Sequence, residues 1–366
     1  MKITVITSPF LELPPIALGA VEKLFYLLAG EWVNNGNQVT FVCCGGGDDA
    51  RMKFVRLKKY KRTGSTKKDL IWDFFYSIKV LWKCPKTDIL LCNTFWTPAL
   101  APLFRWKYRR LVYGVHRYPK GQFWLYPFVH AFICVSTAVA DELRKQLGED
   151  RNVQTINNPV DVKMPMVRGG ANNGNYMIVY AGRVHQEKGL DILFKAAELL
   201  AGKGMKVKLK IIGTTDCAKG GGGEAYVRHL SAIAPNVDVV WVDAIADAAT
   251  LALEMQTGDC FAYPSVADKG ETFGVAPLEA MALGMPVVLS DLPCFGDFAR
   301  PGENSLQFRR GTGAAARLAD EVEYLISNPH ESRRIAENAM RTAAEFSKEK
   351  IALQYLLSFK AMLGGG

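Results

Sequence analysis

Several patterns that mark common protein classes are missing from this sequence of 366 residues. None of its eight cysteines forms a Cys-x-x-Cys pair, which argues against a zinc site and a disulfide framework and favours a reducing compartment. No Gly-x-Gly-x-x-Gly fingerprint is present, which argues against a nicotinamide-dependent dehydrogenase. Residues 1–8 have β-branched strand character without the apolar run of a signal peptide. We therefore expect a cytoplasmic protein.

One stretch, residues 121–140, carries no charge over twenty residues. Pro127, His130 and Ser136 interrupt it, so it predicts a turn, a buried strand and a helix start, and no membrane span.

What the sequence does contain is the ordinary balance of a globular protein, with 49% hydrophobic and 22% charged residues. This balance excludes collagen-like, coiled-coil and disordered classes. At roughly 100–200 residues per domain, the length favours two domains. The formal net charge of +9 indicates anionic partners, which can be nucleic acid, membrane lipid or phosphorylated substrates.

Most of the positive charge lies in one segment. Residues 51–120 contain 18 basic side chains and three acids, so this segment carries +15 and the remainder is net acidic. The basic run 51–68 leads into residues 70–83, where aromatic side chains and lysines are interleaved. Such a segment fits an anionic membrane surface at least as well as nucleic acid. It also fits a solvated basic face over a buried helix, and these interpretations remain open here.

Short apolar runs alternate with amphipathic helices along the chain, which predicts parallel sheets covered by helices on both faces. In the first half we expect strands at 2–7, 38–43, 89–92, 110–114, 131–135 and 153–156, and helices at 20–35 and 137–147. In the second half we expect strands at 177–181, 207–212, 237–242, 260–263 and 286–290, and helices at 190–201, 226–234, 248–256, 277–283, 314–326, 332–346 and 351–362.

The composition changes between these halves. Residues 164–175 are rich in glycine and asparagine, which is typical of a linker. The sequence therefore predicts two Rossmann-like, doubly wound α/β domains that face a central cleft. We place the first at residues 1–163, with the C-terminal helix at about 348–363 returning to it, and the second at 164–347.

Two carboxylates are spaced so that both can meet one ligand. Glu271 lies in a loop after the strand ending at Tyr263, and Glu279 is expected in the first turn of the helix that follows. Gly274 allows close approach of the backbone. Carboxylates accept hydrogen bonds from paired hydroxyls, so sugar and ribose diols are natural targets. Taken alone, an exposed Glu271 and a Glu279 that complements the helix dipole explain the pattern equally well.

Arg183 and Lys188 form a second candidate cluster, between a strand end and a helix start. Together they can bind a diphosphate, with Arg183 as a bidentate fork and Lys188 as a point charge. A solvated basic loop is the alternative. Gly19 precedes the first helix, where nucleotide-binding folds place a phosphate-facing turn. His116 follows the strand at 110–114, although a lone histidine there is more often structural.

Taken together, these motifs resemble those of the family 4 retaining glycosyltransferases of the GT-B fold. The resemblance covers nearly the whole chain and rests on residues 19–22, 135–140, 157–161, 180–183 with 188–189, 263–265 and 271–288.

The resemblance implies a role for each candidate residue. Arg183 and Lys188 would bind the donor diphosphate and stabilise the leaving group, and Gly19 would lie beside it. Glu279 would hold the ribose hydroxyls. Glu271 would contact the donor sugar, near the backbone amides of Phe273 and Gly274, and His116 would reach the sugar from the first domain. No metal and no cofactor is expected.

The resemblance further implies transfer of a hexose-type sugar from a UDP- or GDP-linked donor to a hydroxyl of a glycan or lipid-linked acceptor. We expect a role in bacterial surface polysaccharide synthesis, of the O-antigen, lipopolysaccharide or capsule kind. Residues 51–83 would contact the inner face of the cytoplasmic membrane, and no nucleic acid is expected as a partner. The alternatives are a nucleotide-sugar epimerase of the same fold and a non-enzymatic protein that binds an anionic polymer.

Overall fold

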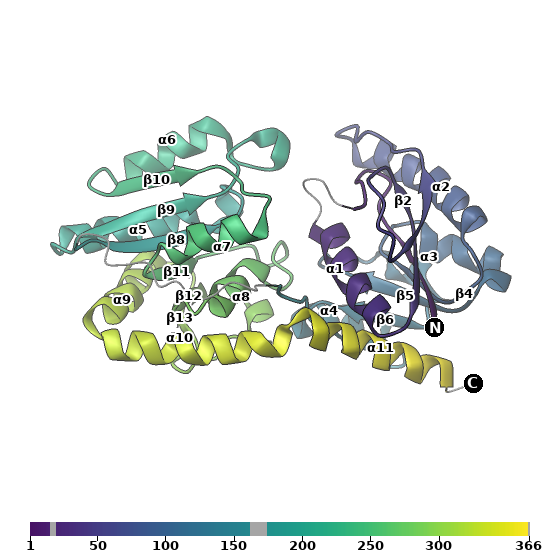
Figure 1. Cartoon of the computed structure of the whole chain (residues 1–366). Coiled ribbons are helices and arrows are strands. Elements are labelled where there is room, and N and C mark those ends of the chain that lie inside the picture. Colours follow the sequence, from purple (N-terminus) through teal and green to yellow (C-terminus); the bar gives the residue numbers. More distant parts are fainter. Residues whose placement is uncertain (15–19, 162–173, 365–366) are drawn as a thin grey trace. The chain divides into compact units, whose positions relative to one another are not determined.

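The computed structural model describes residues 1–14, 20–161 and 174–364. The chain divides into two compact units, each built around its own parallel sheet (Figure 1). The first unit comprises residues 1–159 and 347–366, and the second comprises residues 160–346. Both units are α/β, as the alternation of strands and helices predicts.

The first unit contains a seven-stranded parallel sheet in the order β3-β2-β1-β4-β5-β6-β7. Its strands are β1 (Lys2–Ile6), β2 (Gln38–Cys44), β3 (Lys53–Leu57), β4 (Thr87–Cys92), β5 (Tyr108–Val115), β6 (Ala131–Cys134) and β7 (Val153–Thr155). The central strands are buried on both faces and are continuously apolar, as parallel sheets covered by helices require.

Helices and short 3-10 segments connect these strands. They are α1 (Ala20–Asn34), α2 (Thr66–Lys83), α3 (Thr97–Leu100), η1 (Ala101–Lys107), η2 (Gln122–Leu125) and α4 (Thr137–Leu147). The last helix of the chain, α11 (Lys348–Gly364), also belongs to this unit and packs on α1. Trp32 of α1 lies between Tyr355 and Phe359 of α11, with ring centroids 5.7 Å away in both cases. The prediction that the C-terminal helix returns to the first domain is therefore confirmed.

The second unit contains a six-stranded parallel sheet in the order β10-β9-β8-β11-β12-β13. Its strands are β8 (Tyr176–Ala181), β9 (Val207–Ile212), β10 (Asp238–Val242), β11 (Cys260–Tyr263), β12 (Val287–Ser290) and β13 (Leu306–Phe308). Its helices are α5 (Leu190–Gly202), α6 (Gly223–Ile233), α7 (Ala248–Gln256), α8 (Val275–Ala282), α9 (Ala314–Ser327) and α10 (Pro329–Ala343), with 3-10 turns η3 (Gln186–Lys188), η4 (Cys217–Lys219), η5 (Pro293–Phe295) and η6 (Ala344–Phe346).

The structure differs from the sequence-based expectations in a few places. Helix α8 begins at Val275 because Gly274 adopts a left-handed conformation, with φ of 96°, and starts the helix there. Glu279 is therefore the fifth residue of α8. It lies beyond the first turn, whereas we expected it within the first turn. The sequence pattern gives no bounds for β3, α2 or β13, because these segments are short or rich in charge and show no clear hydrophobic period.

Some expectations fall on residues that the structure does not describe. Gly19, the boundary between residues 163 and 164, and most of the predicted linker lie outside the described residues. Among the described helices, none combines the length and the apolar character that crossing a bilayer requires.

Candidate active site

The sheet of the second unit reverses its strand order between β8 and β11. These strands pair with each other, while β9 and β10 extend the sheet on one side and β12 and β13 on the other. Ligands of doubly wound sheets bind outside the carboxyl ends of the strands at such a reversal. The loop after β8 carries Arg183 and Lys188, and the loop after β11 carries Glu271. The topology therefore brings three predicted site residues to one edge of the sheet.

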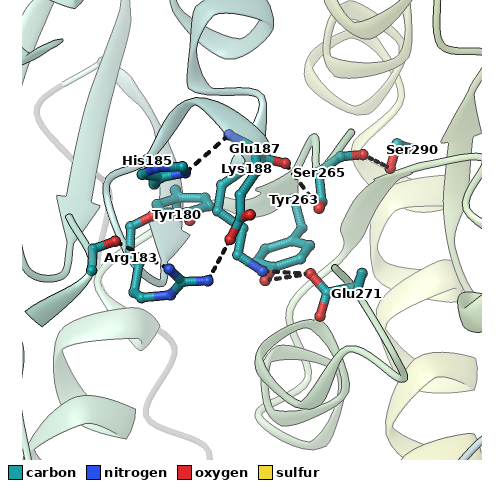
Figure 2. Close-up of polar contacts among 10 residues, drawn as sticks. Tyr180, Arg183, His185, Glu187, Lys188, Tyr263, Ser265, Glu271 and Ser290 are labelled. Atoms are coloured by element: carbon teal, nitrogen blue, oxygen red, sulfur yellow. Dashed lines mark hydrogen bonds and ion pairs between the residues drawn. The ribbon is translucent and has the colours of Figure 1, made fainter. Parts of the chain in front are cut away.

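Lys188 and Glu271 form the centre of this edge (Figure 2). Nζ of Lys188 donates a hydrogen bond of 2.7 Å to Oε2 of Glu271, and the hydroxyl of Tyr263 donates to the same oxygen at 3.1 Å. The side chains of Lys188 and Glu271 are only 9% and 11% exposed. The ammonium also lies 5.5 Å from the centre of the Tyr263 ring, within cation–π range. Each charge is thus compensated in a largely dry environment, where an unpaired charge is costly.

Two stacked tyrosines adjoin this ion pair, with Tyr263 in contact with Glu271. The rings of Tyr180 and Tyr263 are 5.7 Å apart and nearly parallel, at 12°. Burial, together with the nearby Glu271 carboxylate, holds the pKa of both phenols well above the usual value. Both therefore stay protonated and act as donors, Tyr263 to Glu271 and Tyr180 to the carbonyl oxygen of Arg183 at 2.9 Å.

Arg183 faces a different partner. Its guanidinium forms an ion pair with Glu187 and donates to the carbonyl oxygen of Gly220 at 3.1 Å. The side chain is 44% exposed, so the guanidinium remains accessible to an anion from solvent. Figure 2 shows the Arg183–Glu187 pair on the same edge as the Lys188–Glu271 pair. Both predicted cations therefore carry a carboxylate partner in this structure.

Backbone contacts join the loop after β8 to the loop after β11. The amide of Val266 donates to the carbonyl oxygen of Glu187 at 3.0 Å, and the hydroxyl of Ser265 approaches the same oxygen at 3.4 Å. Gly189 permits this approach, because it has φ of 70° and a Cβ there would lie 2.0 Å from the carbonyl oxygen of Pro264. The positions of Lys188 and Glu271 are thus fixed by main-chain contacts as well as by their own ion pair.

Helix α8 adds a set of backbone amides beside Glu271. Gly274 starts it, and a Cβ at Gly274 would lie 2.6 Å from the ring of Phe295. Phe273 is buried and packs against Phe298 at 5.4 Å, which anchors the backbone before the helix. The amides at a helix start attract anions and hydroxyl oxygens. Glu279, further along α8, is half-buried.

The remaining predicted residues belong to the first unit. His116 follows β5 and meets the ring of Phe25 edge-on, with centroids 5.0 Å apart. Burial lowers the pKa of His116 to about 4, so its imidazole is neutral at pH 7. Gly19 lies outside the described residues.

Two residues of this edge had no assigned role in the sequence analysis. Tyr263 entered only as part of a motif, and Glu187 was not singled out. The sequence signal for the Arg183–Glu187 pair is only that opposite charges lie four residues apart, because this segment is a loop and a 3-10 turn and not an α-helix. No comparable signal links Tyr263 to Glu271, because the contact depends on the course of the loop between them. Within residues 1–14, 20–161 and 174–364, no group of three or more His, Cys, Asp or Glu side chains is arranged to hold a metal ion.

Comparison with protein families matches both units. Residues 21–164 match the family described as Glycosyltransferase Family 4, and residues 166–342 match the family described as Glycosyl transferases group 1. Among curated proteins, the chain is 27% identical to the capsular polysaccharide biosynthesis glycosyltransferase CapM of Staphylococcus aureus, over 49% of this chain and 44% of that protein. It is 25% identical to the phosphatidyl-myo-inositol mannosyltransferase of Mycobacterium leprae, over 65% and 62%. The matched segments thus span less than two thirds of these relatives.

Solved structures resemble the chain over its full length. Sucrose-phosphate synthase from Thermosynechococcus elongatus has a TM-score of 0.80 at 16% identity and covers 100% of both chains. Anabaena Alr3699/HepE, solved in complex with UDP and glucose, has a TM-score of 0.74 at 20% identity and covers 99% of this chain and 100% of its own. At these identities the likeness shows the fold alone.

Proposed function

Because the chain joins a Glycosyltransferase Family 4 domain to a Glycosyl transferases group 1 domain in a GT-B fold, we propose that it is a retaining glycosyltransferase. It transfers a hexose-type sugar from a UDP- or GDP-linked donor to a hydroxyl of a glycan or lipid-linked acceptor. The reaction serves the synthesis of a surface polysaccharide, and it needs neither a metal ion nor a cofactor.

One observation carries this proposal. Lys188, Glu271 and Tyr263 converge at the strand-order reversal between β8 and β11, with Arg183 on the same edge and the start of α8 adjoining it. This edge offers cations for phosphate and a carboxylate for hydroxyls, which are the two chemistries that a nucleotide sugar presents. The complex of HepE with UDP and glucose supports the assignment of a nucleotide-sugar donor.

The chemistry follows from where charge develops. When the bond between the anomeric carbon and the donor phosphate oxygen breaks, negative charge grows on the leaving diphosphate. Arg183 and Lys188 stabilise that charge, which replaces the role that a metal ion has in other transferases. On binding, the phosphate competes with Glu187 and Glu271 for these cations. The carboxylate of Glu271 is then available to accept hydrogen bonds from donor sugar hydroxyls, and Glu279 accepts them from the ribose.

Retention of configuration is explained without a protein nucleophile. The acceptor hydroxyl attacks the anomeric carbon on the face from which the phosphate leaves, and its proton passes to the departing phosphate oxygen. One carbon–oxygen bond forms as the other breaks, and the nucleoside diphosphate carries the proton away. His116 of the first unit is neutral at pH 7, so its proposed role is that of a hydrogen-bonding group and not of a cation.

The proposed acceptor and the proposed cellular location of the protein rest on the activities of two relatives and on the positive charge of the chain. One relative is a glycosyltransferase of capsular polysaccharide biosynthesis and another is a phosphatidyl-myo-inositol mannosyltransferase, so one acts in polysaccharide synthesis and the other on a lipid. We place the protein in the cytoplasm, at the inner face of the membrane, where a lipid-linked acceptor is found. Residues 51–83 provide the positive charge for that contact.

The donor is tested by thermal unfolding of the purified chain with UDP, GDP and ADP. The matching nucleotide raises the midpoint in a concentration-dependent way, since it binds the folded state alone. Transfer from the matching nucleotide sugar is then followed in the presence of EDTA, and the anomeric configuration of the product is determined by NMR. A product of inverted configuration would refute the retaining assignment, and loss of transfer with EDTA would refute metal independence.

The site is tested with Glu271→Gln and Lys188→Ala. Each reduces transfer at least about tenfold, equal to a barrier increase of ~1.4 kcal/mol. Lys208→Ala is the control for loss of a paired lysine, because Lys208 of β9 forms an ion pair with Asp238 of β10 at 2.9 Å, in a more exposed place, and is not part of the proposed site. If Glu271→Gln or Lys188→Ala keeps transfer at the level of Lys208→Ala, the site assignment is wrong.

Two other functions stay testable in the same assays. An epimerase of this fold would convert the nucleotide sugar without an acceptor, and chromatography of the nucleotide pool detects this. A non-enzymatic protein that binds an anionic polymer would show neither reaction.

A further inference from the structure

Helix α2 has an apolar stripe on its solvent side. Its inner face is buried through Tyr76, Ser77, Val80 and their neighbours. The outer face, where a surface helix is normally polar, instead carries Ile71, Phe75, Ile78 and Trp82, which are 56%, 50%, 38% and 71% exposed. These residues follow one another at helical spacings of four, three and four, so they form one continuous row opposite the buried face.

The apolar surface continues beyond α2 onto η1. The ring of Trp82 contacts Phe104 at 6.5 Å, and Phe104 contacts Trp106 at 5.6 Å. Trp106 and its neighbour Leu103 are 64% and 67% exposed. Exposed apolar side chains that are scattered singly need no explanation, but a contiguous set such as this marks an interaction surface. We call Ile71, Phe75, Ile78, Trp82, Leu103 and Trp106 the α2–η1 surface.

The charge around this surface has one sign. Lys68, Lys79 and Lys83 are exposed and lie along one flank of the row, because spacings of eleven and four return to the same side of a helix. The two acids of α2 point elsewhere. Asp73 is buried and accepts a hydrogen bond from the amide of Trp96 at 2.9 Å, and Asp69 accepts from Thr63. The surface is therefore apolar and cationic, without an acid on its outer side within α2.

The basic run before α2 contributes less than its charge suggests. Arg51 pairs with Asp49, Arg56 with Asp48 and Lys59 with Glu12, so three of its cations are already neutralised. Arg56 also bonds to the backbone carbonyl of Leu13, which gives it a structural role. The proposed surface therefore relies on the lysines of α2, and Arg51, Arg56 and Lys59 are not part of it.

We propose that the α2–η1 surface docks on an anionic lipid bilayer, with the apolar row inserted at the headgroup boundary and the lysine flank on anionic headgroups. Aromatic side chains suit that boundary, whereas a nucleic acid could stack its bases on the rings but would leave Ile71 and Ile78 uncovered. A second copy of the chain would bring two positive surfaces together, which is unfavourable. The inference deepens the proposed function and draws its biological meaning from it, because it places the enzyme where a lipid-linked acceptor is found.

The test is co-sedimentation of the full chain with phosphatidylcholine vesicles, with and without phosphatidylglycerol, at low and high salt. We expect binding to vesicles that contain phosphatidylglycerol, weakened by salt. The variant Phe75→Ser/Trp82→Ser weakens it about tenfold or more. The variant Lys68→Gln/Lys83→Gln weakens it about 25-fold, at roughly fivefold for each lysine.

Matched controls separate this surface from general exposure and charge. Leu353→Ser/Leu357→Ser removes two apolar side chains of similar exposure on α11, and Lys195→Gln/Lys206→Gln removes two exposed lysines of the second unit. Both controls bind vesicles like the unchanged chain. Unchanged thermal midpoints of the lysine variant show that lost binding does not reflect unfolding.

Three results would overturn the proposal. The first is equal sedimentation of the α2 variants and their controls, and the second is binding to a single-stranded oligonucleotide in preference to anionic vesicles. The third is a dimer in solution that Phe75→Ser/Trp82→Ser dissociates. Failure here is distinguishable from failure of the proposed function, because nucleotide binding by Arg183 and Lys188 is measured without vesicles.

Discussion

At the scale of single residues, the candidate site is centred on a carboxylate that accepts hydrogen bonds from two donors. Glu271 receives both the ammonium of Lys188 and the phenol of Tyr263 on one oxygen. This arrangement keeps the Lys188 ammonium and the Glu271 carboxylate paired and largely shielded from water until a ligand competes for them. The same residues therefore contribute to stability and to the proposed chemistry, and a substitution tests both.

The two contributions are separable by a double-mutant cycle. Lys188→Met leaves the carboxylate of Glu271 without its cation and lowers the free energy of unfolding by about 3 kcal/mol. Glu271→Gln/Lys188→Met removes both charges and recovers most of this loss, because neither charge is left uncompensated. Transfer activity does not recover. Chemical denaturation gives the stabilities, and a double variant as unstable as Lys188→Met would show that the ion pair is not the source of the loss.

His116 gives a pH-dependent prediction. Its pKa in the folded state is about 4, below the ordinary value of about 6.5, because burial disfavours the imidazolium. Between these values the unfolded chain binds a proton that the folded chain does not, so stability falls as pH falls from 6.5 to 4. The slope from this group reaches about 1.4 kcal/mol per pH unit.

Replacing His116 with Asn removes this contribution. The free energy of unfolding is measured for both proteins by denaturant titration at several pH values. The native chain loses stability relative to His116→Asn as the pH falls from 6.5 to 4. Carboxylates titrate in both proteins and cancel in the comparison. An NMR signal of the His116 imidazole that titrates near pH 6.5 in the folded protein would contradict the lowered pKa.

At the scale of elements, the start of α8 depends on a single glycine. Gly274 has φ of 96°, and a Cβ there would lie 2.6 Å from the ring of Phe295. Gly274→Ala therefore carries both backbone strain and a clash. We expect it to lower the free energy of unfolding by about 2 kcal/mol or more and to weaken nucleotide binding, since it displaces the amides beside Glu271.

Gly204→Ala is the matched control for Gly274→Ala. Gly204 has φ of 82°, but a Cβ there would meet nothing within 4 Å, so the change costs only about 1 kcal/mol of backbone strain. Its nucleotide affinity stays unchanged. Thermal unfolding with and without nucleotide measures both quantities for each variant. Equal losses in the two variants would mean that the contact with Phe295 is unimportant.

The elements themselves could be predicted from sequence to different degrees. Helix α4 and strand β9 match their predicted bounds, because their hydrophobic periods are clean and Ser136 caps the helix through the amide of Val139. Helix α2 was predicted only as an alternative without bounds, because its apolar residues occupy both the buried and the exposed face. Strand β3 was missed because charges break its apolar alternation at the sheet edge.

At the scale of the whole molecule, the first unit is closed by a helix from the far end of the chain. Helix α11 packs Tyr355 and Phe359 against Trp32, and all three side chains are buried. Phe359→Ala removes a buried ring and lowers the free energy of unfolding of the first unit by about 3–5 kcal/mol. Leu353→Ala, at an exposed position of the same helix, changes it by less than about 0.5 kcal/mol.

Two observables locate the effect of Phe359→Ala. Loss of native tryptophan fluorescence reports chiefly the first unit, which holds six of the seven tryptophans, while the rise in thermal midpoint on adding nucleotide reports the second unit. We expect the first to occur at lower denaturant concentration and the second to persist. A variant that loses nucleotide binding as well would show that the second unit depends on α11.

The alternation of strands and helices, and hence the α/β class, can be predicted from the chain alone, because hydrophobic period is a local property. The same pattern also places Arg183, Lys188 and Glu271 at strand ends. That Lys188 contacts Glu271, 83 positions away, follows from the folded arrangement, because pairing of β8 with β11 brings their loops together. Likewise, composition showed that residues 51–83 are basic and aromatic. Which side chains are neutralised, buried or exposed on α2 depends on contacts that no local pattern contains.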